Sequence, residues 1–96
     1  MLVLITYDIG QTDAAGAQRL RRVARHCQNY GIRVQNSVFE CRVDATQYTK
    51  LKHQLLQEIN VEVDNIRFYF LGNHYAGKVE HFGVERGVQL DEPVIL

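Results

Sequence analysis

The order of hydrophobic patterns along the chain is the feature that most restricts its fold. Residues 2–8, residues 66–71 and the two halves of 32–43 are short runs rich in β-branched and aromatic residues, which is typical of strands. Residues 14–30 and 44–59 repeat apolar residues every three or four positions, which is typical of amphipathic helices. This βαββαβ order predicts an α+β, ferredoxin-like domain, in which one antiparallel sheet carries two helices on one face.

Residues at the ends of the two helical stretches support these boundaries. Thr12 or Asp13 is suited to cap the first helix, and Gly31 follows its last turn. Asp44 precedes the second helix with Gln47 three residues later, which is a capping-box pattern. Residues 35–37 are expected to form a turn or a bulge between the two middle strands.

The length and composition are those of one globular domain, with 96 residues of which 46% are hydrophobic. The apolar runs are shorter than the roughly 20 residues that span a bilayer, and the N-terminus lacks a signal-peptide pattern. We therefore expect a cytoplasmic protein. Cys27 and Cys41 lie on apolar faces and are expected to be reduced core thiols, with a disulfide as the alternative.

Both faces of the expected sheet carry apolar residues. In the first strand Val3 and Ile5 alternate with Leu2 and Leu4. Because the helices can cover only one face, we expect a second copy of the chain to cover the other in a two-fold homodimer.

The end of the chain is expected to take part in this dimer. Residues 78–83 predict a further short strand, so we place the ferredoxin-like domain at residues 1–83. Residues 84–96 end in an apolar Val-Ile-Leu sequence that is unsuited to exposure in water. We expect this C-terminal extension to pack on the partner subunit and add a strand to its sheet.

Asp8 places a carboxylate at the end of an otherwise apolar strand. On the expected alternation it faces away from Val3 and Ile5, toward the partner subunit. A two-fold axis near this point would bring two Asp8 carboxylates together, and these repel unless a cation lies between them. Mg²⁺ prefers a few carboxylate oxygens plus water. The alternative is that Asp8 only stabilises a turn.

Basic residues are concentrated in the first half of the chain, although the formal net charge is zero. Most are arginine, which can bind a phosphate through two hydrogen bonds. The arginines of the first half are Arg19, Arg21, Arg22, Arg25, Arg33 and Arg42. They predict a local basic surface, with an ordinary solvated helix face as the alternative.

Three stretches carry a resemblance to a known family: "LVLITYDI" at residues 2–9, "RVQNSVFEC" at 33–41 and "IRFYFLG" at 66–72. With these residues the chain resembles the CRISPR-associated Cas2 family, and within it the members of subtype I-C systems. The resemblance implies a ferredoxin-like homodimer in which a C-terminal strand pairs with the partner. It also implies that Asp8 binds the metal at the dimer interface, with Tyr7 beside it as a second catalytic residue.

The resemblance further implies a set of nucleic-acid-binding residues. The family's arginine early in the first helix matches Arg19, with Arg21 or Arg22 as alternatives. The others are Arg33, Ser37 and Phe39. Considered from the sequence alone, Tyr7 is equally consistent with an ordinary core aromatic. The sequence favours a core position for Phe39 and a turn or bulge for Ser37.

The implied function is that of a metal-dependent endonuclease that takes part in spacer acquisition with the Cas1 integrase. The expected cofactor is Mg²⁺, or Mn²⁺ in its place, and the expected substrates are double-stranded DNA, single-stranded RNA or both. The alternative is a non-catalytic dimeric scaffold that bridges integrase units and binds protospacer DNA.

Overall fold

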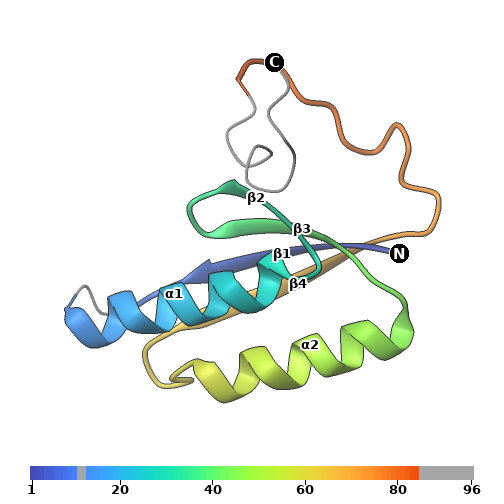
Figure 1. The fold of residues 1–96 in the computed structure, drawn as a ribbon. Helices are drawn as coiled ribbons and strands as arrows, with labels where there is room; N and C mark the ends of the chain where they lie inside the picture. The colour runs from blue at the N-terminus through green and yellow to red at the C-terminus, as the bar shows by residue number, and fades with distance from the viewer. Residues whose placement is uncertain (11–12, 85–96) are drawn as a thin grey trace.

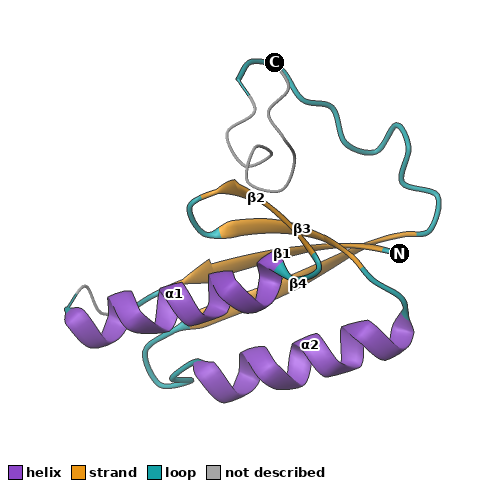
Figure 2. Cartoon of the chain, viewed as in Figure 1, coloured by secondary structure: helices purple, strands orange, loops and turns teal. Residues whose placement is uncertain are grey.

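The computed structural model describes residues 1–10 and 13–84, which form a four-stranded antiparallel sheet with two helices on one face (Figure 1). The strand order across the sheet is β2-β3-β1-β4. Figure 2 shows the layer of helices and the layer of strands. The element order along the chain is βαββαβ, which confirms the ferredoxin-like order expected from the sequence. The elements are β1 (Leu2–Asp8), α1 (Ala14–Gln28), β2 (Gly31–Gln35), β3 (Val38–Arg42), α2 (Ala45–Glu58) and β4 (Asn65–Gly72).

The core lies between the sheet and the helices. β1 occupies the interior of the sheet and pairs with β3 on one side and β4 on the other. Because side chains alternate along a strand, Val3, Ile5 and Tyr7 all face the helices, with exposed fractions of 0 to 2%. Cys27 and Cys41 are buried in the same core as free thiols, as the sequence predicted.

The helix starts follow the predicted capping residues. The Asp13 carboxylate accepts a hydrogen bond from the Gly16 N–H at 3.0 Å. Asp44 and Gln47 form the full capping box. The Gln47 N–H donates to Asp44 Oδ1 at 2.7 Å, and the Asp44 N–H donates to Gln47 Oε1 at 2.9 Å. The first helix ends at Gln28, slightly earlier than predicted, and Gly31 begins β2 instead of ending the helix. A Cβ on Gly31 would lie 1.9 Å from the Glu40 carbonyl oxygen, so the close approach of β3 requires glycine there.

The face of the sheet opposite the helices is not covered by a helix in the described part of the chain (Figure 1). The register places Leu4 beside Tyr69 and Thr6 beside Val38 on this face. Tyr69 is 43% exposed, whereas Leu4 and Val38 are half-buried. We call these residues, together with the neighbouring Asp8, the open face. Apolar residues therefore lie on both faces of the sheet, as the sequence indicated.

The segment that follows β4 differs from the prediction. Residues 78–83 form no strand within the described residues, and Val79 and Phe82 are exposed. Alternating apolar residues favour a strand only where another strand offers its N–H and C=O groups, and no other described strand of this chain does so. Residues 85–96, which make up most of the predicted C-terminal extension, lie outside the described residues.

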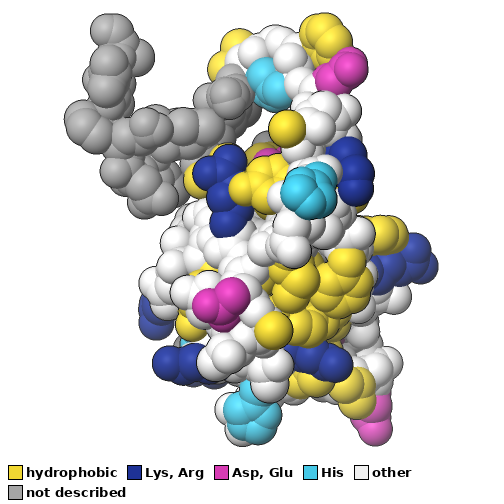
Figure 3. Space-filling view, turned by 90° about the vertical axis from the view of Figure 1, so that its right-hand side faces the viewer, with side chains coloured by type: hydrophobic (Ala, Val, Ile, Leu, Met, Phe, Trp, Pro, Cys, Tyr) yellow, Lys and Arg dark blue, Asp and Glu magenta, His cyan; other side chains and the backbone are white. Residues whose placement is uncertain are grey.

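A second apolar region borders the edge strand β4. Tyr48 of α2 packs edge-on against Phe68 and Phe70, with ring centroids 5.8 and 5.1 Å apart, yet Phe70 remains 55% exposed. Figure 3 views the molecule from the side on which the N-terminus lies in Figure 1 and shows hydrophobic side chains gathered near its centre. Neither of the described helices, with 15 and 14 residues, is long and apolar enough to span a membrane.

Candidate active site at the end of β1

Asp8 is the last residue of β1, and its side chain is exposed. It pairs with Asn65 of β4, beside the pair formed by Thr6 and Arg67. Because Tyr7 faces the helices, the alternation of β1 directs Asp8 to the open face, as the sequence predicted. A carboxylate in this position can bind a cation or a water molecule without competition from a buried partner.

The Asp8 carboxylate is a donor of the type that fits Mg²⁺. Carboxylate oxygens are the ligands that Mg²⁺ prefers, and a site commonly uses one or two of them with several waters. The described residues contain no group of three or more His, Cys, Asp or Glu side chains close enough to hold a metal ion. One Asp8 carboxylate with waters is the smallest site of this kind, and a second copy of Asp8 would supply a second carboxylate.

Tyr7 and Asp8 are neighbours in sequence but lie on opposite faces of the sheet. The Tyr7 hydroxyl donates a hydrogen bond to Asp64 Oδ2 at 2.9 Å. Burial and the neighbouring Asp64 carboxylate raise the pKa of Tyr7 to about 12. Tyr7 is therefore a neutral, buried donor, and its hydroxyl does not point to the side where Asp8 would hold a metal.

Asp64, in the connection between α2 and β4, is a residue that the sequence analysis did not identify. Its side chain is fully buried. Oδ2 accepts hydrogen bonds from the Tyr7 hydroxyl, from Arg19 Nε at 2.7 Å and from the Asn60 N–H at 3.0 Å. Oδ1 accepts from the Gly10 N–H at 3.1 Å and from Arg19 Nη2 at 3.2 Å. Burial alone would raise the pKa of Asp64, but these donors, Arg19 first, outweigh it and hold the pKa well below its ordinary value.

Arg19 is turned inward. Its guanidinium forms a two-point ion pair with Asp64, and its side chain is only 14% exposed. Three arginines of the same helix are exposed: Arg21, Arg22 and Arg25. Of these, Arg22 lies 3.9 Å from Glu58 of α2, which also contacts His26 at 2.9 Å. The exposed basic surface of α1 is therefore formed by Arg21, Arg22 and Arg25, and Arg19 contributes to the buried network instead.

The predicted residues of the β2–β3 hairpin occupy different environments. Phe39 is fully buried on the helix side of the sheet, so no base can stack on it in this conformation. Arg33 pairs with Phe39 across the two strands, and its guanidinium lies 5.5 Å from the ring centre. Its Nε is buried and has no hydrogen-bond partner among residues 1–10 and 13–84. Ser37 is half-buried in the turn, and its carbonyl oxygen accepts the Tyr7 N–H at 2.9 Å, next to Asp8.

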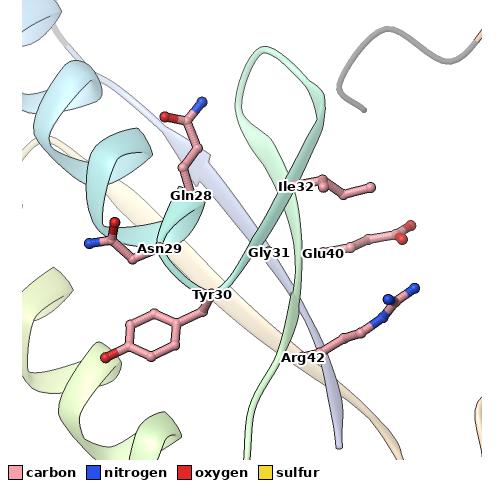
Figure 4. Close-up of a pocket in the computed structure, with 7 residues that line it drawn as sticks. All are labelled: Gln28, Asn29, Tyr30, Gly31, Ile32, Glu40 and Arg42. Carbon is pink, nitrogen blue, oxygen red and sulfur yellow. The ribbon is translucent and has the colours of Figure 1, made fainter. Parts of the chain in front are cut away.

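A pocket near the C-terminal end of α1 lies apart from Asp8. Figure 4 shows that Gln28, Asn29 and Tyr30 extend to one side of the β2 backbone and Ile32, Glu40 and Arg42 to the other. Because these side chains diverge, they do not form a set of groups that could bind one small ligand. Asp8, with the neighbouring hairpin turn, remains the candidate site.

The sequence matches the family model described as "CRISPR associated protein Cas2" over residues 1–79. This chain belongs to the Cas2 family. It is similar to the CRISPR-associated endonuclease Cas2 of Halalkalibacterium halodurans, with 56% identity over 99% of both chains. It is also similar to the CRISPR-associated endoribonuclease Cas2 of Chlorobaculum tepidum, with 52% identity over the full length of both.

A solved Cas2 structure supports the fold. The crystal structure of Streptococcus pyogenes Cas2 superposes on this chain with a TM-score of 0.78 and 49% identity, covering 86% of this chain and all of the other.

Asp64 was missed because an acid in a polar connection, "VEVDN" at residues 61–65, resembles an ordinary solvated loop residue. The available signal was a buried tyrosine hydroxyl, Tyr7, that needs an acceptor inside the fold.

Proposed function

We propose that this Cas2 family member is a CRISPR-associated endonuclease that hydrolyses phosphodiester bonds with Mg²⁺, or Mn²⁺ in its place, held between the Asp8 carboxylates of two copies. The observation that carries the proposal is the exposed carboxylate of Asp8 at the end of β1, on the open face. One relative is named an endonuclease and another an endoribonuclease, so double-stranded DNA and single-stranded RNA are both candidate substrates.

A two-fold homodimer is the assembly that would supply the second carboxylate. The open face carries Leu4, Val38 and the exposed Tyr69, and a second sheet would remove these side chains from water. The same packing brings the two copies of Asp8 toward a common axis if that axis passes near the end of β1. Residues 84–96 would then extend onto the partner.

The chain's own residues would hold the substrate around this point. When bound, the metal would supply a polarised phosphate oxygen and an activated water. Asp8 would hold it in place on the open face. Ser37 is the candidate phosphate ligand beside Asp8, because it adjoins the end of β1. Arg22, exposed on α1, and Arg33, on the helix side with Phe39, are candidates for phosphates farther along the substrate. Phe39 and Arg19 face inward and would support the site without touching a base.

A non-catalytic scaffold is the second candidate, and it is favoured because the described residues contain no group of three or more His, Cys, Asp or Glu side chains that could hold a metal ion. In this function the dimer would bridge Cas1 integrase units, and exposed arginines would bind protospacer DNA. Arg22→Ala and Arg33→Ala would then weaken DNA binding about equally for all sequences, because phosphate contacts carry no sequence information. We also propose the finer assignment to subtype I-C, supported by the three stretches that carry the resemblance, and a cytoplasmic location.

The test compares Asp8→Asn with Asp13→Asn in the purified full-length protein. Asp13→Asn is the matched control because it neutralises an exposed acid five residues after Asp8, while asparagine caps a helix as well as aspartate does. We expect Asp8→Asn to lower cleavage more than about 100-fold, beyond the usual effect of a residue that only supports a metal ligand. Asp13→Asn and the wild-type protein should cleave equally, and a chelator should stop both. Cleavage that persists in Asp8→Asn contradicts the proposed role of Asp8 and points to a contaminating nuclease, whereas a wild-type protein that does not cleave at all leaves the scaffold.

A further inference from the structure

Asp64 contacts the chain on both sides of Asp8. The Tyr7 side chain precedes Asp8 and donates to Asp64 Oδ2 at 2.9 Å, while the Gly10 N–H follows it and donates to Oδ1 at 3.1 Å. One buried carboxylate thus holds the end of β1 and the residue that follows Ile9 at two points, which flank the proposed metal ligand. Asp8 itself points to the opposite face and makes no part of this network.

The same carboxylate is itself held by two other segments. Arg19 of α1 binds it through two nitrogens, and the Asn60 N–H closes the connection that carries Asp64. A two-point arginine–carboxylate pair fixes the orientation of the carboxylate plane as well as its position. Asp64 therefore holds its acceptors for Tyr7 and Gly10 in one defined geometry.

Packing at Gly10 makes this geometry tight. A Cβ at Gly10 would lie 1.8 Å from the Val63 carbonyl oxygen, so the backbone after Asp8 lies directly against the connection that precedes β4. A movement of the Asp64 connection would be transmitted to Gly10 and from there to Asp8. The contact explains why the loop has a glycine here without requiring an unusual backbone conformation.

We propose that Asp64 is a positioning residue for Asp8, acting through Tyr7 and Gly10 and oriented by Arg19. The proposal rests on the function proposed above, because it concerns the metal ligand of that site. It also assigns new roles to Tyr7, which the family resemblance linked to catalysis, and to Arg19, which the resemblance linked to nucleic-acid binding. Tyr7 and Arg19 influence the reaction through Asp64, without contacting the substrate.

The test measures Mn²⁺ affinity and the exchange rate of the Gly10 amide in the metal-free protein, in addition to cleavage. The principal variant is Asp64→Asn, which has nearly the same shape but loses the charge and one acceptor oxygen. The matched control is Asp44→Ala, which removes the cap of α2 at the end of the sheet opposite Asp8. It lowers stability without touching the network, so it separates a positioning role from a general loss of stability.

We expect Asp64→Asn to weaken Mn²⁺ binding about 10-fold, as is usual for a residue that orients a metal ligand. The Gly10 amide should exchange about 10-fold faster, since its acceptor is weakened. Asp44→Ala should keep the wild-type Mn²⁺ affinity. A folded Asp64→Asn protein that binds Mn²⁺ as the wild type does would overturn the proposal, as would an equal loss of affinity in Asp44→Ala.

Tyr7→Phe keeps the test decisive if Asp64→Asn does not fold. It removes only one hydroxyl and leaves the other donors of Asp64 in place. We expect a smaller loss of Mn²⁺ affinity, about 3-fold, below the usual range because one flank of Asp8 stays fixed. Unchanged affinity in a folded Tyr7→Phe protein counts against the proposal.

Asp8→Asn, measured in parallel, distinguishes the two levels of failure. If Asp8→Asn still binds Mn²⁺, the proposed metal site is wrong. If Asp8→Asn loses binding while Asp64→Asn and Tyr7→Phe retain it, only the positioning role is wrong.

Discussion

Asp8 and Asp64 are two aspartates at the same end of the sheet, and the protein treats them in opposite ways. Asp64 is fully buried, and five N–H or O–H groups donate to its two oxygens. Asp8 lies on the open face and is exposed. A buried carboxylate is tolerated only when it is paired and hydrogen-bonded, and such a group has no capacity left for a ligand. The comparison teaches that the acid available for chemistry is the exposed one, whereas the buried one is structural.

Removing each carboxylate should give the largest contrast in stability. Asp64→Ala should lower the free energy of unfolding by about 3 kcal/mol, the lower end of the range for breaking a buried ion pair, because Arg19 is partly exposed and can reach water. Asp8→Ala should change it by less than about 0.5 kcal/mol, as exposed substitutions do. Urea unfolding of both variants checks this, and equal losses would remove the distinction between the two acids.

Acid titration should sharpen the contrast. The pKa of Asp64 is lower in the folded chain than in the unfolded chain, where it is about 3.9. The unfolded chain therefore binds more protons as the pH falls, and the stability contributed by Asp64 is complete above about pH 5 and lost progressively below it. Unfolding free energies measured between pH 3 and pH 7 should fall less steeply in Asp64→Asn than in the wild type. Parallel curves for the two proteins would show that Asp64 is not held in its ionised form.

The order of elements could be predicted from sequence because its signals are local. The alternation of Val3, Ile5 and Tyr7 and the capping box of Asp44 each depend on residues a few positions apart. The exposure of Asp8 followed from the same alternation. The strand expected at residues 78–83 was wrong because a strand also needs a partner, which a local pattern cannot supply.

The buried network could not be predicted because its parts are distant in sequence. Asp64 meets Tyr7, Gly10 and Arg19 across separations of 57, 54 and 45 residues. Arg19 and Arg22 are one helical turn apart, and the sequence pattern does not distinguish them. In the structure Arg19 binds Asp64, whereas Arg22 is exposed. Only the packing of α1 against the connection before β4 distinguishes them.

Loss of a helix cap remote from Asp8 calibrates the other effects. Asp44→Ala removes the cap of α2 and should cost about 1 kcal/mol of stability, as loss of a capping aspartate usually does. Its effect should be the same with and without Mn²⁺, because Asp44 is remote from Asp8. Thermal unfolding under both conditions checks this, and a cost that depends on the metal would mean that both ends of the sheet respond to it.

The most direct test of the shared metal site is the stoichiometry of Mn²⁺ binding to the full-length protein, measured by calorimetry together with its mass by light scattering. The account predicts a two-chain particle that binds one Mn²⁺ per two chains and loses this binding in Asp8→Asn. One Mn²⁺ bound to each single chain, or binding that survives in Asp8→Asn, would contradict it.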